Sequence, residues 1–187
     1  MRIWIGGIIL FSLFLVRTAA AQDNSRFDIS AGYSYVRGNQ PPGGCGCFSM
    51  NGGDASFAYN LTSHFGAVAD FNVVHAGNIA GSGQGVTLTS YQFGPQFNFT
   101  LSNRFTPFVH GLVGDAHANG LGYGTNGVSA NALTAVIGGG VDLRVSHAIS
   151  LRLFEADYDY TRFQNGVNTR ENNLRLVFGV VFHLGKQ

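Results

Sequence analysis

Apolar and polar residues alternate with a period of two through most of the chain, a pattern that predicts β-strands. It is clearest at 89–99, where aromatic side chains recur at every second position of one face. That face consists of Tyr91, Phe93, Phe97 and Phe99. The pattern predicts further strands at 27–37, 54–61, 65–74, 131–145, 149–161 and 171–184, and one with a less distinct face at 105–116. The expected class is all-β, with one oily and one small or polar face on each strand.

The connections between these strands alternate in length. The longer ones are 38–51, 77–86, 117–130 and 162–170, and the shorter ones are 62–64, 102–104 and 146–148. A transmembrane barrel has short turns at one rim and longer loops at the other. We therefore expect an eight-stranded antiparallel up-and-down transmembrane β-barrel, with both ends of the barrel domain at the short-turn rim.

The composition supports a membrane barrel. The chain has 27 glycines, 16 phenylalanines and only 11% charged residues, whereas soluble domains typically have about 25%. Lipid cannot satisfy backbone polar groups, so a sheet in a membrane must close on itself. The alternative is a soluble, lipocalin-like carrier with its aromatic face inside, which the alternating connections disfavour.

The N-terminal segment has the pattern of a secretory signal peptide. Arg2 precedes an apolar run over 3–16, and the small residues at 18–21 offer a cleavage site near Ala21. We expect a signal peptide at 1–21 and the barrel domain at 22–187. Without the signal peptide the chain has nine basic and ten acidic residues, a balance that does not favour a nucleic-acid partner.

The polar strand faces include charged residues that a narrow barrel turns into its lumen. These lumen candidates are Asp70, Asp142, Arg144, Glu155, Asp157 and Arg175. Since unpaired buried charges are costly, we expect Arg144 and Arg175 to pair with acids of neighbouring strands. The row of Glu155, Asp157 and Asp159 also allows a calcium site or an acid–base pair, although ion pairing is the simpler interpretation.

Cys45 and Cys47 lie in the first long connection. Export to an oxidising compartment favours a disulfide between them, although a bridge across one residue is strained. Free thiols or a metal site are the alternatives. No second cysteine pair is present to complete a zinc site, and the six histidines lack a metal-binding spacing. We expect no metal and no cofactor.

Three segments resemble the bacterial outer-membrane β-barrel domain family, which comprises OmpA/OmpX-like eight-stranded proteins of the porin-like superfamily. They are AVIGGGVDLR at 135–144, LRLFEADY at 151–158 and LRLVFGVVFHL at 174–184. Gly179, Phe182 and Leu184 look like the C-terminal signal that the barrel-assembly machinery recognises, although the chain ends without a terminal phenylalanine. The resemblance implies an outer-membrane location, with outer-membrane lipid, lipopolysaccharide and that machinery as partners.

No enzyme active site is expected from the sequence. Ser146 and His147, with Ser150 nearby, lie at a short turn far from the outer leaflet, where a lipid-modifying enzyme would act. We therefore expect a structural or surface-interaction role through the long loops. A narrow, mildly cation-selective pore is the first alternative, and a lipid-modifying outer-membrane enzyme is the second.

Overall fold

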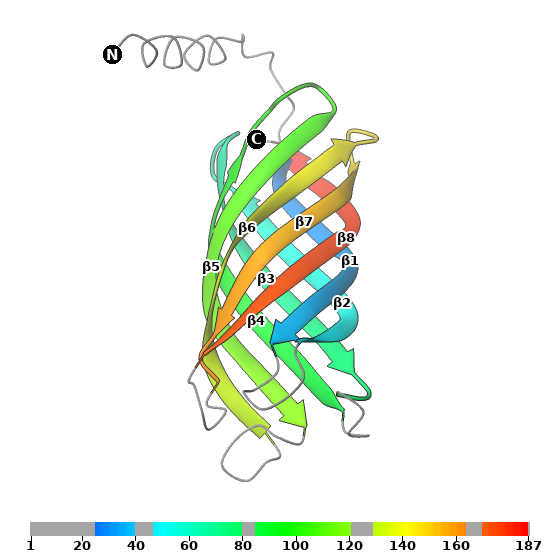
Figure 1. Ribbon diagram of the computed structural model, residues 1–187. Helices are drawn as coiled ribbons and strands as arrows, with labels where there is room; N and C mark the ends of the chain where they lie inside the picture. Colours follow the sequence, from blue (N-terminus) through cyan, green and yellow to red (C-terminus); the bar gives the residue numbers. More distant parts are fainter. Residues whose placement is uncertain (1–24, 40–46, 80–84, 121–128, 164–169, 187) are drawn as a thin grey trace, which may run out of the picture.

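The structure is a computed structural model that describes residues 25–39, 47–79, 85–120, 129–163 and 170–186. Its strands are β1 (Ser25–Asn39), β2 (Cys47–Asn60), β3 (Phe65–Ala76), β4 (Val86–Asn98), β5 (Phe105–Gly120), β6 (Ser129–Arg144), β7 (Ile149–Thr161) and β8 (Glu171–Lys186). Each strand pairs antiparallel with the next, and β8 pairs with β1 to close the barrel (Figure 1). The predicted eight-stranded up-and-down barrel is confirmed.

The described residues contain no helix of the length and apolarity needed to cross a membrane.

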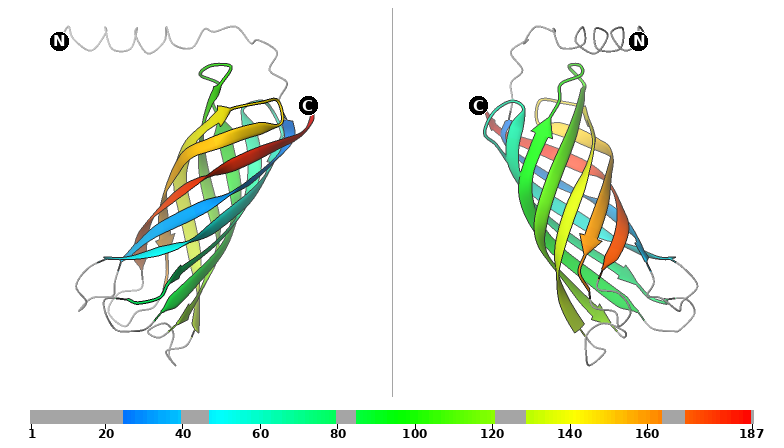
Figure 2. Two further views of the ribbon diagram at one scale, coloured as in Figure 1. Left: turned by 90° about the vertical axis from the view of Figure 1, so that its right-hand side faces the viewer. Right: turned by 60° about the vertical axis from the view of Figure 1, so that its left-hand side comes forward.

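The two ends of the barrel differ (Figure 2). The connections 61–64, 99–104 and 145–148 lie at one end, the turn rim, where Ser25 of β1 pairs with Lys186 of β8. The other four connections leave from the opposite end, the loop rim. The strands extend further toward the loop rim than the sequence predicted, since β2 begins at Cys47 and β5 continues to Gly120. Gly52 and Gly53 interrupt the apolar alternation in β2 but still pair with β3.

The outer wall of the barrel is apolar. Its exposed side chains include Ile29, Tyr33, Phe57, Phe71, Tyr91, Phe93, Val113, Leu133, Ile137 and Phe178. In β5, whose faces the sequence left ambiguous, Val109 and Val113 point outward while Phe108 and Leu112 are buried in the interior. A soluble, lipocalin-like carrier would have the aromatic faces of the strands inside the barrel. In the structure these faces lie on the outside. An apolar outer face is the arrangement that lipid requires.

The strands β1 and β8 meet closely at two glycines that pair with each other, Gly32 and Gly179. A Cβ on Gly32 would lie 2.3 Å from the Phe178 carbonyl oxygen, and one on Gly179 would lie 2.4 Å from that of Ala31. Only glycine fits such a close approach of two backbones. These two positions therefore permit the close approach of β1 and β8 at this point of their pairing.

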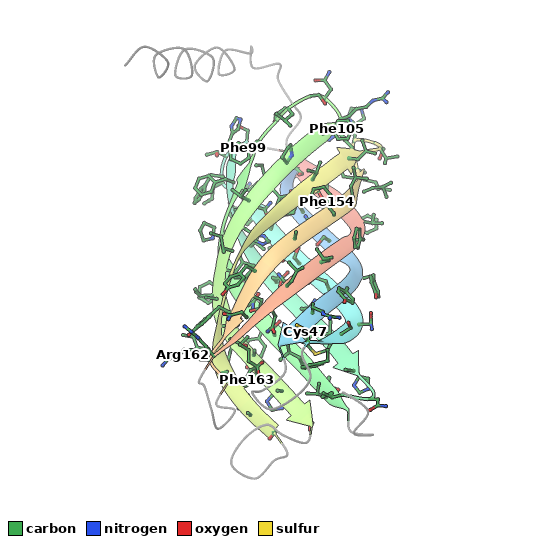
Figure 3. The ribbon with its side chains drawn as sticks, in the orientation of Figure 1. Cys47, Phe99, Phe105, Phe154, Arg162 and Phe163 are labelled. Carbon is green, nitrogen blue, oxygen red and sulfur yellow. The ribbon has the colours of Figure 1, made fainter. Side chains whose placement is uncertain are left out.

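The interior changes character along its length. Toward the loop rim it contains a cluster of buried apolar side chains, which we call the apolar plug (Figure 3 labels Phe163). The plug consists of Val36, Phe48, Met50, Val74, Ala76, Val86, Leu88, Ala116, Ala118, Ala132 and Phe163. Between the plug and the turn rim most buried side chains are polar or charged, beside a smaller apolar cluster of Ala58, Val68, Leu112 and Val136. An eight-stranded barrel has room for this side-chain filling and little more.

Candidate functional site

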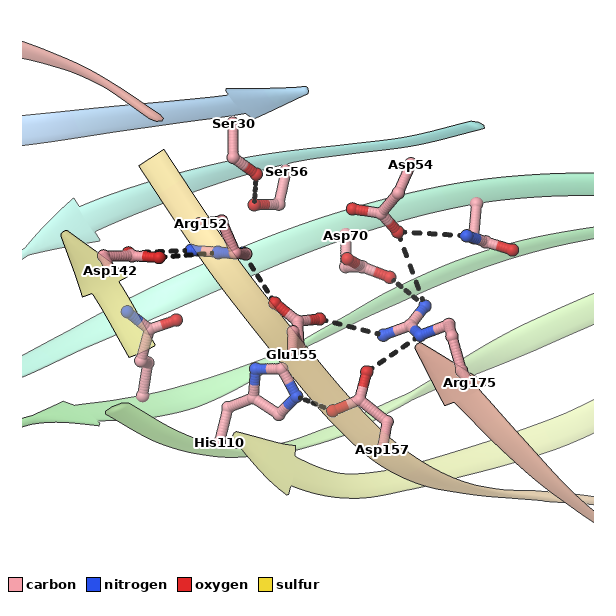
Figure 4. Close-up of polar contacts among 12 residues, drawn as sticks. Ser30, Asp54, Ser56, Asp70, His110, Asp142, Arg152, Glu155, Asp157 and Arg175 are labelled. Atoms are coloured by element: carbon pink, nitrogen blue, oxygen red, sulfur yellow. Dashed lines mark hydrogen bonds and ion pairs between the residues drawn. The ribbon is translucent and has the colours of Figure 1, made fainter. Parts of the chain in front are cut away.

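Arg175 of β8 is the centre of the charged interior (Figure 4). Its Nη1 donates to Asp70 Oδ1 of β3 at 2.7 Å, and its Nε donates to Asp157 Oδ2 of β7 at 2.9 Å. Asp54 of β2 and Glu155 of β7 lie within 3.7 and 3.8 Å of the guanidinium. The Arg175 side chain is 1% exposed. A single guanidinium therefore links strands from opposite sides of the barrel.

Arg152 of β7 forms a second centre. It donates to both carboxylate oxygens of Asp142 of β6, from Nε to Oδ1 at 3.0 Å and from Nη2 to Oδ2 at 3.2 Å. It also donates from Nη1 to Glu155 Oε2 at 2.6 Å. Its guanidinium carbon also lies 4.4 Å from the centre of the Phe108 ring. Two-point binding of a carboxylate and stacking on an aromatic ring both suit arginine's planar group.

A β-bulge in β7 turns Arg152 into the lumen. The pairing register shifts between Arg152 and Glu155, and the two residues between them, Leu153 and Phe154, are both exposed on the outer wall. Such a bulge inserts one extra residue and reverses which face the following residues occupy. Strict alternation from Glu155 places Arg152 outside, which is why the sequence did not identify it.

His110 of β5 extends the network, with Nε2 2.9 Å from Asp157 Oδ1. We call Asp54, Asp70, His110, Asp142, Arg152, Glu155, Asp157 and Arg175 the lumen network. Hydrogen bonds of uncharged side chains connect the remaining strands. Asn72 of β3 donates to Asp54 and to Ser34 of β1, and Gln92 of β4 donates to Thr134 of β6, which donates to Asp159. Side-chain bonds across the lumen thus involve every strand.

The structure corrects one expected pairing. Arg144 lies half-buried near the turn rim and forms no ion pair within the part of the chain that the structure describes. Asp142 pairs instead with Arg152, because the bulge brings that arginine inside on the adjacent strand. The other lumen candidates, Asp70, Glu155, Asp157 and Arg175, come together as described above. Asp54 and His110 also belong to the network; both lie on the inward-facing alternation of their strands.

His110, Glu155 and Asp157 offer ligand atoms within 4.8 Å of one another. Arg152 and Arg175 already bind the carboxylates of Glu155 and Asp157. These two guanidinium groups disfavour the binding of a metal cation at the same carboxylates, because like charges repel strongly in a low-dielectric interior. The arrangement suits an ion-pair network.

A second polar group closes the interior at the turn rim. Ser150 Oγ lies 2.7 Å from His183 Nε2, and His183 Nδ1 lies 2.6 Å from Asp28 Oδ1. Ser25 also hydrogen-bonds Asp28, and Asn60 donates to its other oxygen at 2.7 Å. The order serine–histidine–acid is that of a hydrolase triad. No local sequence pattern predicts it, because the three residues lie on different strands.

The surroundings of this triad do not favour acyl transfer. Ser150 is 2% exposed, and the adjoining cavity of about 50 Å³ is lined by polar side chains including Arg144 and Asp142. Such a cavity holds a few water molecules. A nucleophilic serine needs room for an ester carbonyl beside its Oγ. The hydrogen bonds instead tie β1, β7 and β8 together where the barrel closes.

The remaining predicted residues lie apart from these groups. Phe182 and Leu184 are exposed on the outer wall near the turn rim, on the same strand as Gly179. Cys47 begins β2 at the loop rim, whereas Cys45 lies outside the described residues, as does the predicted signal peptide. The disulfide and the cleavage near Ala21 stay predictions.

A closed antiparallel barrel with a lipid-compatible outer wall and a filled polar lumen defines a transmembrane β-barrel. The family model for the outer membrane protein beta-barrel domain matches residues 7–182. The chain belongs to this family, in agreement with the resemblance found in the sequence.

Solved structures of outer-membrane proteins have the same fold. Neisserial surface protein A is 16% identical, with a TM-score of 0.65 over 86% of this chain and 98% of its own. Ail, the attachment invasion locus protein of Yersinia pestis, is 16% identical, with a TM-score of 0.60 over 85% and 98%. OprG from Pseudomonas aeruginosa is 11% identical, with a TM-score of 0.51 over 88% and 98%. No curated protein sequence matches the chain.

Proposed function

We propose that this outer-membrane barrel is closed to ions, is not an enzyme, and serves as a rigid anchor for loop-rim connections that interact with surface partners. The observation behind the proposal is Arg175, which lies across the lumen and is bound by acids of β2, β3 and β7. A filled, cross-linked interior makes the barrel stiff. Rigid scaffolds with variable surface segments commonly place function in those segments.

The narrow pore is the main alternative, and two features oppose it. An ion would have to displace buried ion pairs of the lumen network. The ion would also have to pass the apolar plug, whose side chains, such as Val74, Leu88 and Ala116, cannot replace the water molecules that hydrate an ion. Hydrophobic constrictions close channels by excluding water.

Single-channel recording in planar bilayers tests the closed lumen. The folded protein is expected to give a flat current at voltages where a reconstituted general porin gives steps. Reproducible steps with a cation-selective reversal potential would support the pore alternative. The variant Arg175→Ala tests whether such steps come from ions passing through the lumen. If they do, the step size should change when the Arg175 side chain is removed from the centre of the lumen.

Adhesion tests the surface role. Cells displaying the protein are compared, on host cells and on matrix-coated surfaces, with cells displaying a variant whose segments 40–46, 80–84, 121–128 and 164–169 are replaced by Gly-Ser sequences of equal length. We expect the variant to lose adhesion while keeping its heat-modifiable gel band. Equal adhesion by both would contradict a loop-based role. Ail is named for attachment and invasion, but at 16% identity its likeness supports only the fold.

We further propose that the mature chain begins after cleavage near Ala21 and that the barrel-assembly machinery recognises Gly179, Phe182 and Leu184. The outward exposure of Phe182 and Leu184 supports this, because a recognition signal must be accessible. The variant F182A/L184A should lower the amount of protein in the outer membrane. Phe178→Ala is the matched control, being equally exposed on the same strand, and an equal loss in both would argue against recognition.

A further inference from the structure

Two strands repeat the same outward-facing motif near the loop rim. In β1, Tyr33, Tyr35 and Arg37 are successive outward positions. The same order recurs in Tyr158 and Tyr160 of β7 and in Arg162, which directly follows that strand. Both strands pair with β8, so the two motifs flank it. The loop-rim ends of β1, β7 and β8 lie side by side in both views of Figure 2.

The tyrosines mark the membrane interface on this side of the barrel. The Tyr33 hydroxyl donates to Asn51 and the Tyr158 hydroxyl donates to Asn172 at 2.6 Å, while Tyr35 and Ser49 hydroxyls lie 2.8 Å apart. Tyrosine places its ring in the apolar region and its hydroxyl among polar groups, and it is enriched at bilayer interfaces. The next outward position beyond each tyrosine pair therefore lies at the level of lipid headgroups.

Arginines occupy that level. Arg37 and Arg162 follow the tyrosines, and Arg170 precedes β8; all three are exposed. Thr161 pairs with Glu171, the last pair of β7 and β8. Arg162 and Arg170 are the next residues beyond that pair, and continuing the same strand spacing gives a backbone separation of about 5 Å. Arg37 pairs with Leu174, about 13 Å along β8 from Arg170. Arg162 points away from the barrel in Figure 3.

No carboxylate neutralises this group among the described residues. The acids of β1, β7 and β8 that the structure describes all lie on inward faces: Asp28, Glu155, Asp157, Asp159 and Glu171. The described partners of the Arg37 guanidinium carry no carboxylate: it donates to Ser49 Oγ at 3.1 Å and hydrogen-bonds the side chains of Tyr35 and Cys47. The outer surface at the loop-rim ends of β1, β7 and β8 is thus basic, although the chain as a whole is nearly neutral.

We propose that Arg37, Arg162 and Arg170 bind the phosphate groups of a phosphorylated glycolipid of the outer leaflet, of the lipid A type. A guanidinium group can donate two parallel hydrogen bonds to two oxygens of one phosphate, a bidentate geometry that the lysine ammonium group cannot form. Below them the exposed Leu174 and Phe178 of β8 offer an apolar wall for the acyl chains. The span from Arg170 to Arg37 suits a disaccharide headgroup with a phosphate at each end. This inference rests on the proposed outward orientation of the loop rim.

Native mass spectrometry of the full folded protein, released from nanodiscs, tests the site by counting bound lipid. The probes are bisphosphorylated lipid A and the same lipid without phosphates. The variant R37Q/R162Q/R170Q removes the three charges. The variant R26Q/R104Q removes two exposed arginines at the turn rim and is the control for general charge attraction. A heat-modifiable band shows that each variant is folded.

We expect the triple variant to bind bisphosphorylated lipid A more than tenfold more weakly than the wild type, because each basic group near a charged membrane surface contributes measurably. The control variant should bind as the wild type does, and the lipid without phosphates should bind all proteins weakly. Equal loss in both variants, or equal binding of the two lipids, would overturn the proposal.

Soluble polyanions are separate arms of the test. Inorganic phosphate or a sulfated polysaccharide that binds the arginines, with no preference for lipid A in the nanodisc, would assign the site to a soluble ligand and overturn the lipid proposal. None of these outcomes depends on adhesion or conductance. A failed surface role and a failed lipid site therefore give different results.

Discussion

The Arg175 guanidinium of β8 donates to the Asp70 carboxylate of β3 across 2.7 Å, although the two residues are 105 positions apart in the chain. Strands β1 and β2 lie between β3 and β8 in the barrel. The bond therefore crosses the interior and does not follow the sheet. It exists only when the barrel is closed.

Replacing Arg175 should destabilise the barrel strongly. Arg175→Met leaves Asp70 and Asp157 buried without their cation, and breaking a buried pair by removing one partner typically costs about 3–5 kcal/mol. Urea titration monitored by the heat-modifiable band measures the free energy of unfolding. Arg104→Met, at an exposed turn position, is the matched control and should change it by less than about 0.5 kcal/mol. Equal stability of the two variants would mean that the network does not stabilise the barrel.

A glycine supports the network from β6. A Cβ on Gly138 would lie 1.9 Å from Asp157 Oδ1 and 2.6 Å from the Ala156 carbonyl oxygen. Gly138→Ala should therefore push Asp157 away from His110 and Arg175 and cost about 1–3 kcal/mol. On the adjacent strand a Cβ on Gly111 meets nothing within 4 Å, so Gly111→Ala should be tolerated. Urea midpoints of the two variants compare them directly, and a neutral Gly138→Ala would contradict the packing.

The bulge in β7 predicts two successive lipid-facing residues. In a background without native cysteines, spin labels are attached at positions 152, 153, 154 and 155 in turn. Labels at Leu153 and Phe154 should both be accessible to oxygen dissolved in the bilayer, whereas those at Arg152 and Glu155 should not. Labels at Tyr158 and Asp159, where alternation is regular, calibrate the two responses. Strict alternation from 152 to 155 would exclude the bulge.

The triad at the turn rim should be chemically silent. A fluorophosphonate probe, which reacts with activated serines, is expected to leave the folded protein unlabelled while labelling a serine hydrolase in the same sample. The reason is that Ser150 is buried beside a cavity too small for an acyl group. Labelling that disappears in Ser150→Ala and persists in Ser146→Ala would show an active nucleophile and contradict the non-enzymatic role.

The sequence predicted the fold almost completely because strand alternation is a local property. The outward Phe93 and the inward Asp70 follow from their neighbours alone, since a lipid-facing wall demands apolar side chains at every second position. The sequence also contained one signal of the bulge that the prediction did not use. Leu153 and Phe154 are adjacent apolar residues between Arg152 and Glu155, an interruption that strict alternation does not allow.

The amino-acid sequence by itself thus determined the number of strands, their two faces and the alternation of short and long connections. The tertiary structure decided which charges meet. Asp142 pairs with Arg152 because of a register shift, and Asp28 reaches His183 because β1 closes onto β8. Pairing across a lumen depends on the register of strands far apart in the chain. Register is fixed jointly by closure and packing, and no local pattern specifies it.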